Sequence, residues 1–255
     1  MRRHLAVAAL AMACALCGLT PGKAASQDLN CASPPFQAPP EIRQMVSALA
    51  PAFEQFPAIG ASLFQDLRAL CLAPNLHDSH GYFEADERRI VIDARLPPAL
   101  RSTVLIHELR HLQQQDFGTC PAPDLSMTQN ARAIYAMEAD ASAISHVVAW
   151  QLRESGQTGM WDALASYPLQ ADIAEAFARE MARSGDPRAA ASVAFAQWYA
   201  RAERRELYYI AACSDYLERN DRTHRLPSYA RLTPNFFARL CKMPDGHAYS
   251  CADAG

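Results

Sequence analysis

The chain has 255 residues, a formal net charge of −3 at pH 7 and only 9% aromatic residues. This length predicts one domain, or two small ones, with a substantial core. The small charge and the lack of a basic run give no indication of nucleic-acid binding. Alanine is abundant, which favours helix over sheet, so we expect a mainly α fold of the α+β type.

The first 25 residues differ from the rest in composition. Residues 1–4 are basic, residues 5–19 are apolar, and small residues follow around Ala24 and Ala25. These three parts are typical of a secretory signal peptide, cleaved after Ala24 or Ala25. We therefore expect a periplasmic or secreted protein.

Cleavage would leave a single domain at residues 26–255, with a catalytic core at about 82–156 and a helical C-terminal half at 157–255. The apolar run is too short for a comfortable membrane span, so no stable span is expected afterwards. Two alternatives stay open at this stage. One is an uncleaved N-terminal anchor, and the other is a lipid anchor on Cys14 or Cys17.

The cysteines indicate an oxidising compartment. Those that remain after cleavage are Cys31, Cys71, Cys120, Cys213, Cys241 and Cys251. An even number is expected of a disulfide-bonded exported protein, but six cysteines allow 15 pairings and the spacing does not choose among them. None lies in a Cys-x-x-Cys pair, so a cysteine-based zinc site is not indicated.

Two stretches before the middle of the chain have apolar residues at helical spacing. Residues 41–56 and 61–72 are both predicted to be core helices. The following loop, residues 74–81, carries His77 and His80, which we interpret as surface histidines rather than metal ligands.

Residues 82–85 and 89–93 flank a short polar turn and are rich in aromatic and β-branched residues. This pattern predicts a β-hairpin, the one clear strand signal in the chain. An edge strand beside an active site can pair with an extended peptide substrate. A hairpin that only covers the next helix fits the pattern equally well.

The next helix is predicted to begin near Pro98 and to end at Gly118, and it contains the sequence His-Glu-x-x-His. His107 and His111 are four residues apart, so both imidazoles lie on one face and can bind one metal ion. Glu108 is turned about 100° away around the helix and can reach a water molecule beside the metal. On a helix, this motif indicates a zinc hydrolase.

A catalytic zinc ion normally has three protein ligands, so a third is needed. Ser126 and Gln129 resemble a capping box that opens an alanine-rich helix, which we expect to end near Gly156. Glu138 lies on the apolar face of this helix. A buried, unpaired carboxylate costs several kcal/mol, so a metal held by the preceding helix would be its natural partner. A buried salt bridge to an arginine is the alternative.

Other downstream residues are weaker candidates for the third ligand. Asp116 is too close to the motif on the same helix, and Asp124 lies in a loop and stays open. His146 is turned about 80° from Glu138. Asp140 is turned about 200° from Glu138 and cannot easily share its metal, so it either orients a neighbour or is solvated.

The C-terminal half is also predicted to be helical. The expected helices are residues 161–167, 169–184, 186–213 and 235–240. Residues 215–229 are polar and are predicted to form a loop. The tail from Cys241 onwards carries two cysteines and is expected to be stapled to the body.

Taken together, the motif from His107 to His111 and the sequence Glu-Ala-Asp-Ala from Glu138 resemble the gluzincin zinc metallopeptidases. More narrowly, the chain is similar to uncharacterised bacterial metallopeptidase families. The resemblance covers residues 82–150. Many relatives have an aspartate four residues after the ligand glutamate, whereas this chain has Ser142.

The resemblance implies a zincin-like helical domain in which His107, His111 and Glu138 hold Zn²⁺. It also implies that Glu108 acts as general base on a peptide or protein substrate, with Asp140 as a neighbouring support. An oxyanion-stabilising residue is not evident. The candidates are Tyr135, Tyr167, Tyr208 and Tyr209.

Two other classes of function stay open. One is a catalytically silent zinc-binding or scaffold protein of the cell envelope that binds a partner. The other is a helical binding protein without metal, in which the motif is accidental and Glu138 pairs with an arginine. Oligomeric state and cleavage specificity are not predicted.

Overall fold

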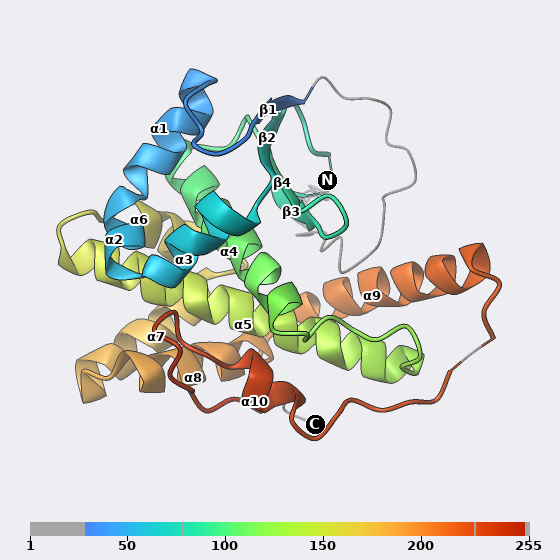
Figure 1. Cartoon of the computed structure of the whole chain (residues 1–255). Coiled ribbons are helices and arrows are strands. Elements are labelled where there is room, and N and C mark those ends of the chain that lie inside the picture. Colours follow the sequence, from blue (N-terminus) through green and yellow to red (C-terminus); the bar gives the residue numbers. More distant parts are fainter. Residues whose placement is uncertain (1–28, 78, 227, 253–255) are drawn as a thin grey trace, which may run out of the picture.

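The computed structural model describes residues 29–77, 79–226 and 228–252. The predicted signal peptide and its alternatives, including Cys14 and Cys17, lie outside these residues. Figure 1 shows a small sheet on one side of a larger set of helices. This confirms the expected mainly α fold with a small β component.

The sheet has four strands in the order β1-β2-β4-β3. Their bounds are Asn30–Ala32 for β1, Ala69–Ala73 for β2, Gly81–Glu84 for β3 and Arg89–Asp93 for β4. The β3 and β4 strands form the predicted antiparallel hairpin, with Tyr82 opposite Val91. The β2 strand pairs in parallel with β4, and β1 pairs antiparallel with β2.

The prediction of a helix at residues 61–72 is wrong in its second half. The chain is helical through α3 (Pro57–Ala61) and the short π-helix η1 (Ser62–Asp66), and then enters β2. Residues 70–73 are all buried because β2 is an inner strand of the sheet. A short apolar run of this kind cannot be distinguished from a buried helix by periodicity.

The predicted helix at residues 41–56 is divided at Leu49 into α1 (Pro40–Ala48) and α2 (Ala50–Gln55). The α4 helix, Pro98–Asp116, then runs between the sheet and α5, Met127–Glu154 (Figure 1). It therefore has core on opposite sides, and every residue from 102 to 114 is buried.

The β3 strand packs directly on α4. A Cβ atom at Gly81 would lie 2.6 Å from Cγ1 of Val104, so a larger residue at this position would push the strand off the helix. At its other end α4 is followed by Gly118 with φ +65°, as expected of a glycine that terminates a helix. The Ser126 side chain accepts a hydrogen bond from the Gln129 N–H, which confirms the predicted start of α5.

The C-terminal half is helical, as predicted. Its elements are α6 (Gly159–Ser166), α7 (Ala171–Ser184), α8 (Pro187–Trp198), α9 (Ala202–Arg222) and α10 (Phe236–Leu240). Two predictions need correction. The segment 186–213 is interrupted between α8 and α9, and α9 continues to Arg222 through much of the predicted polar loop. Ala212 and Tyr216 explain this, because they are buried on the inner face of an otherwise polar helix.

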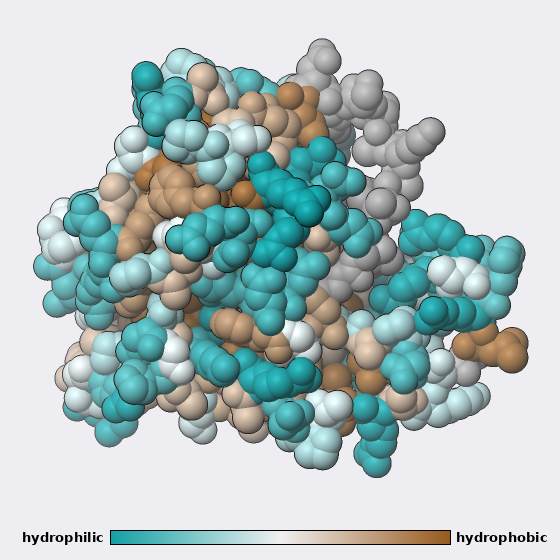
Figure 2. All heavy atoms as spheres, viewed as in Figure 1, coloured by the Kyte–Doolittle hydropathy of each residue, from teal (hydrophilic) through white to brown (hydrophobic). Residues whose placement is uncertain are grey.

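Polar side chains cover most of the face shown in Figure 2, and apolar ones gather over helices α1 to α3. None of the helices at residues 29–77, 79–226 and 228–252 is both long enough and apolar enough to span a bilayer.

Disulfides link Cys31 to Cys71, between β1 and β2, and Cys241 to Cys251 in the C-terminal segment. The second bond closes the tail on itself, and the tail is joined to the body by hydrogen bonds from Arg110 to the Lys242 carbonyl and from the Tyr249 hydroxyl to Asp140 rather than by a disulfide. Cys120 is also disulfide-bonded, whereas Cys213 is a free thiol. The even count therefore does not mean that all six cysteines are paired.

Candidate metal centre

The three predicted ligands meet where α4 packs on α5. His107 and His111 project from one face of α4, and Glu138 comes from the middle of α5. His107 Nε2 lies 3.3 Å from Glu138 Oε2, and His111 Nε2 lies 3.3 Å from Glu138 Oε1. One potential ligand atom from each residue lies within 4.8 Å of the other two.

These three side chains fit a metal ion. Their exposed fractions are 2% for His107, 3% for His111 and 0% for Glu138. His107 Nε2 is buried and has no hydrogen-bond partner among the residues that the structure describes. A buried nitrogen that faces a buried carboxylate at 3.3 Å without a well-formed hydrogen bond is costly unless a proton or a metal cation joins them. Two imidazoles and one carboxylate also form a ligand set that is common at catalytic zinc ions.

The charges within the cluster also favour a cation between the three side chains. Burial opposes ionisation of Glu138, but His111 and His107 outweigh it and hold the pKa of Glu138 well below its usual range. Burial lowers the pKa of His111, whereas Glu138 raises it, and the net pKa is about 9. The protein groups alone thus favour a proton between these residues. A divalent cation would replace that proton, as is usual when a metal binds histidine.

Glu108 follows His107 on α4 and is 1% exposed. Burial raises the pKa of Glu108, the two imidazoles oppose this rise, and the Phe83 N–H donates a hydrogen bond to the carboxylate. Its other oxygen, Oε2, is buried without a hydrogen-bond partner among the described residues. Glu108 therefore lies beside the ligand cluster and is held by the edge strand β3.

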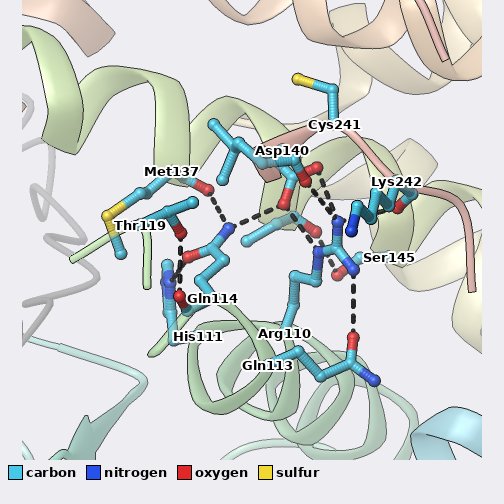
Figure 3. A network of polar contacts seen from close by, with 12 residues as sticks. Arg110, His111, Gln113, Gln114, Thr119, Met137, Asp140, Ser145, Cys241 and Lys242 are labelled. Carbon is cyan, nitrogen blue, oxygen red and sulfur yellow. Dashed lines mark hydrogen bonds and ion pairs between the residues drawn. The ribbon is translucent and has the colours of Figure 1, made fainter. Parts of the chain in front are cut away.

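Asp140 is not part of the cluster and is not solvated. It is fully buried and forms an ion pair with Arg110, whose Nε lies 2.7 Å from Asp140 Oδ2. It also accepts hydrogen bonds from Gln114 Nε2 at 2.7 Å and from the Tyr249 hydroxyl at 2.6 Å. Figure 3 shows the contacts of Asp140 with Arg110 and Gln114, and the contact of Gln114 with His111.

The comparisons with known proteins agree with this centre. The family model described as "Putative metallopeptidase family (DUF6782)" matches residues 23–251. The chain belongs to this family. No curated protein and no solved structure matches it. The family description and the His-His-Glu cluster both indicate a metal-dependent peptidase in general terms.

The other candidate ligands are not at the metallopeptidase centre. Asp116 pairs with Arg88 at 3.0 Å, and Asp124 is exposed in its loop. His146 Nδ1 lies 2.8 Å from the Ser142 carbonyl oxygen, away from Glu138. The arginine alternative for Glu138 is not favoured either, because imidazoles face this carboxylate and Arg110 pairs with Asp140.

Three further predictions have clear outcomes. His77 is exposed, but His80 is only 9% exposed and its ring lies 5.4 Å from that of Tyr167, so the surface interpretation of His80 is wrong. Ser142, which replaces the aspartate of many relatives, accepts a hydrogen bond from Gln170. Among the oxyanion candidates, Tyr135 donates to the Arg205 carbonyl instead.

Sequence reasoning missed Gln114, Arg110 and Tyr249. The position of Gln114 contained a signal, because a residue three positions after His111 lies on the same helix face. Arg110 and Tyr249 gave no local signal, since the partners that bury them come from distant parts of the chain.

Proposed function

We propose that the protein is an exported zinc-dependent peptidase of the gluzincin type. The observation that carries this proposal is the convergence of His107, His111 and Glu138, with potential ligand atoms within 4.8 Å of one another. Two nitrogen ligands and one oxygen ligand suit Zn²⁺ and leave a position open for water, as in catalytic rather than structural zinc sites.

Zinc, when bound, would supply a Lewis acid that polarises the scissile carbonyl and lowers the pKa of water to about 7. Glu108 would accept the proton of the attacking water and pass it to the nitrogen of the leaving amine. The hydrogen bond from the Phe83 N–H supports this role because it holds the carboxylate beside the ligands.

The substrate would be a peptide or protein segment in extended form. The β3 strand is at one end of the sheet and packs on α4 next to the metal centre. A peptide can add to such an edge through main-chain hydrogen bonds. The hairpin would then both cover α4 and align the substrate over it.

Export is supported by the predicted signal peptide and by the disulfides Cys31–Cys71 and Cys241–Cys251. Disulfides persist in oxidising compartments and are rare in the cytosol. We therefore expect the mature protein in the periplasm or outside the cell.

A second function is favoured by one observation. None of the side chains of His107, Glu108, His111 and Glu138 is more than 3% exposed. A substrate can reach these groups only if the centre opens. A zinc-binding protein of the cell envelope without peptidase activity, which binds a partner, would need no such opening.

The test is Glu108→Gln, measured by digestion of a peptide library and by metal analysis. We expect it to abolish hydrolysis and to retain one zinc ion per chain, because the charge of the base is lost and the ligands are unchanged. Glu87→Gln, the same change at an exposed position in the hairpin turn, should leave both unaffected. Hydrolysis by Glu108→Gln would refute the proposal. Zinc without cleavage in the unmodified protein would favour the second function.

A further inference from the structure

We propose that Gln114 is a positioning residue for the metal ligand His111, and that the disulfide-closed C-terminal segment holds Gln114 in place through Asp140. Gln114 would fix which nitrogen of the His111 ring carries the proton. The inference deepens the proposed function and rests on it only in taking zinc as the metal.

The Gln114 amide has only one orientation that suits its neighbours. Its Nε2 lies 2.9 Å from the Met137 carbonyl oxygen and 2.7 Å from Asp140 Oδ2. Both of these atoms accept hydrogen bonds, so this end of the amide must be the NH₂ group. The oxygen, Oε1, consequently faces His111 Nδ1, which is 2.7 Å away (Figure 3).

The position of the amide oxygen determines which nitrogen of the His111 ring carries the proton. Because an amide oxygen only accepts hydrogen bonds, His111 Nδ1 must donate and therefore carries a proton. In the neutral ring the lone pair is then on Nε2. This is the nitrogen that lies 3.3 Å from Glu138 Oε1 in the ligand cluster. Gln114 thus places the lone pair of the neutral ring on the nitrogen that faces the ligand cluster, the usual role of a group that contacts a metal-binding histidine.

Asp140, which holds the Gln114 amide, is itself held by several donors. Its Oδ2 accepts from Arg110 Nε at 2.7 Å and from Gln114 Nε2. Its Oδ1 accepts from Arg110 Nη2 at 3.0 Å and from the Tyr249 hydroxyl at 2.6 Å. Four donor atoms therefore surround a fully buried carboxylate and hold it in one orientation.

Arg110 connects Asp140 to the end of the chain. Arg110 Nη2 also donates to the carbonyl oxygens of Leu240, at 3.0 Å, and Lys242, at 2.7 Å. The disulfide Cys241–Cys251 closes the segment that contains Tyr249, whose N–H donates to the Cys241 carbonyl. The disulfide-closed segment thus supplies two groups to the network behind His111, the Lys242 carbonyl and the Tyr249 hydroxyl, and the end of α10 supplies a third, the Leu240 carbonyl.

The test compares zinc affinity, measured by competition with a chelator, in Gln114→Leu and Gln113→Leu. Gln113 is a matched control, because it is the adjacent buried glutamine and contacts Arg110, Ala58 and Ser62 but not His111. We expect Gln114→Leu to weaken zinc binding about 10- to 100-fold and Gln113→Leu to weaken it far less. Equal losses in both leucine variants would overturn the inference.

A second measurement does not need a stable variant. Long-range ¹H–¹⁵N correlation spectra of the metal-free protein, recorded at a pH at which the ring is neutral, report the tautomer of His111. We expect the proton on Nδ1, and a proton on Nε2 would overturn the inference. Lack of zinc binding by the unmodified protein would instead contradict the proposed function, and the tautomer could still be read.

Discussion

Tyr249→Phe tests the link between the C-terminal segment and the metal centre with the smallest change that breaks it. The substitution removes only a hydroxyl group, and the ring can keep its packing against Phe195, 6.3 Å away between centroids. Burial and then Asp140 raise the pKa of Tyr249 well above its usual value, so the hydroxyl is protonated and donates to Asp140.

The expected cost follows from the contact that is lost. Tyr249 is 6% exposed, and its hydroxyl lies 2.6 Å from an ionised carboxylate. A hydrogen bond to a charged group contributes about 1.5–3 kcal/mol to stability. Asp140 keeps its bonds from Arg110 and Gln114. The loss should therefore stay below the roughly 3–5 kcal/mol of a broken buried ion pair.

The assay is urea unfolding at neutral pH, with Tyr135→Phe as the matched control. The Tyr135 hydroxyl donates at 2.7 Å to the Arg205 carbonyl, a neutral acceptor, so its removal should cost about 0.5–1.5 kcal/mol. We expect Tyr249→Phe to be roughly twice as destabilising. If it costs no more than Tyr135→Phe, the hydroxyl does not bond to an ionised Asp140 and the anchoring argument is wrong.

Three further predictions concern stability and use the same unfolding measurement. Arg110→Met should cost about 3–5 kcal/mol because it leaves the buried Asp140 without its cation; a loss under 1 kcal/mol would mean that the pair is not buried. Cys251→Ser should cost about 2–3 kcal/mol, since the bond to Cys241 closes a loop with a sequence separation of 10; unchanged stability would show that the bond does not form. Burial lowers the pKa of His146 from 6.5 to about 4. Between these pH values the unfolded chain binds a proton at this residue that the folded protein does not, so stability falls as the pH falls through the window, by about 3 kcal/mol in total. His146→Leu should remove this component, and an unchanged pH dependence would contradict the assigned pKa.

The parts of the centre that were predicted are those encoded locally. The spacing of His107 and His111 on a helix fixes their common face, whatever else the chain does. Glu138 was recognisable because a carboxylate on an apolar helix face needs a positive partner. Ser126 and Gly118 marked helix ends through capping preferences that act within a few residues.

The parts that were missed depend on distant contacts. Residues 69–73 became a strand because β4 and β1 cover both edges of β2, which their apolar sequence cannot reveal. Arg110 is buried because it meets Asp140 and carbonyl groups more than 100 positions away, at Leu240 and Lys242. The helical pattern gives the position of Asp140 on its helix but does not identify Arg110, Gln114 and Tyr249 as its partners. The sequence therefore could not decide whether Asp140 orients a neighbour or is exposed to solvent.

The proposed metal centre is tested most directly by metal analysis of the purified mature protein and two variants. We predict one zinc ion per chain in the unmodified protein, and none in Glu138→Ala, which removes the carboxylate between the two imidazoles. Asp124→Ala, which changes the exposed carboxylate of the neighbouring loop, should retain the ion. A protein without metal, or a Glu138→Ala variant that binds zinc as tightly as the unmodified chain, would contradict the proposed centre.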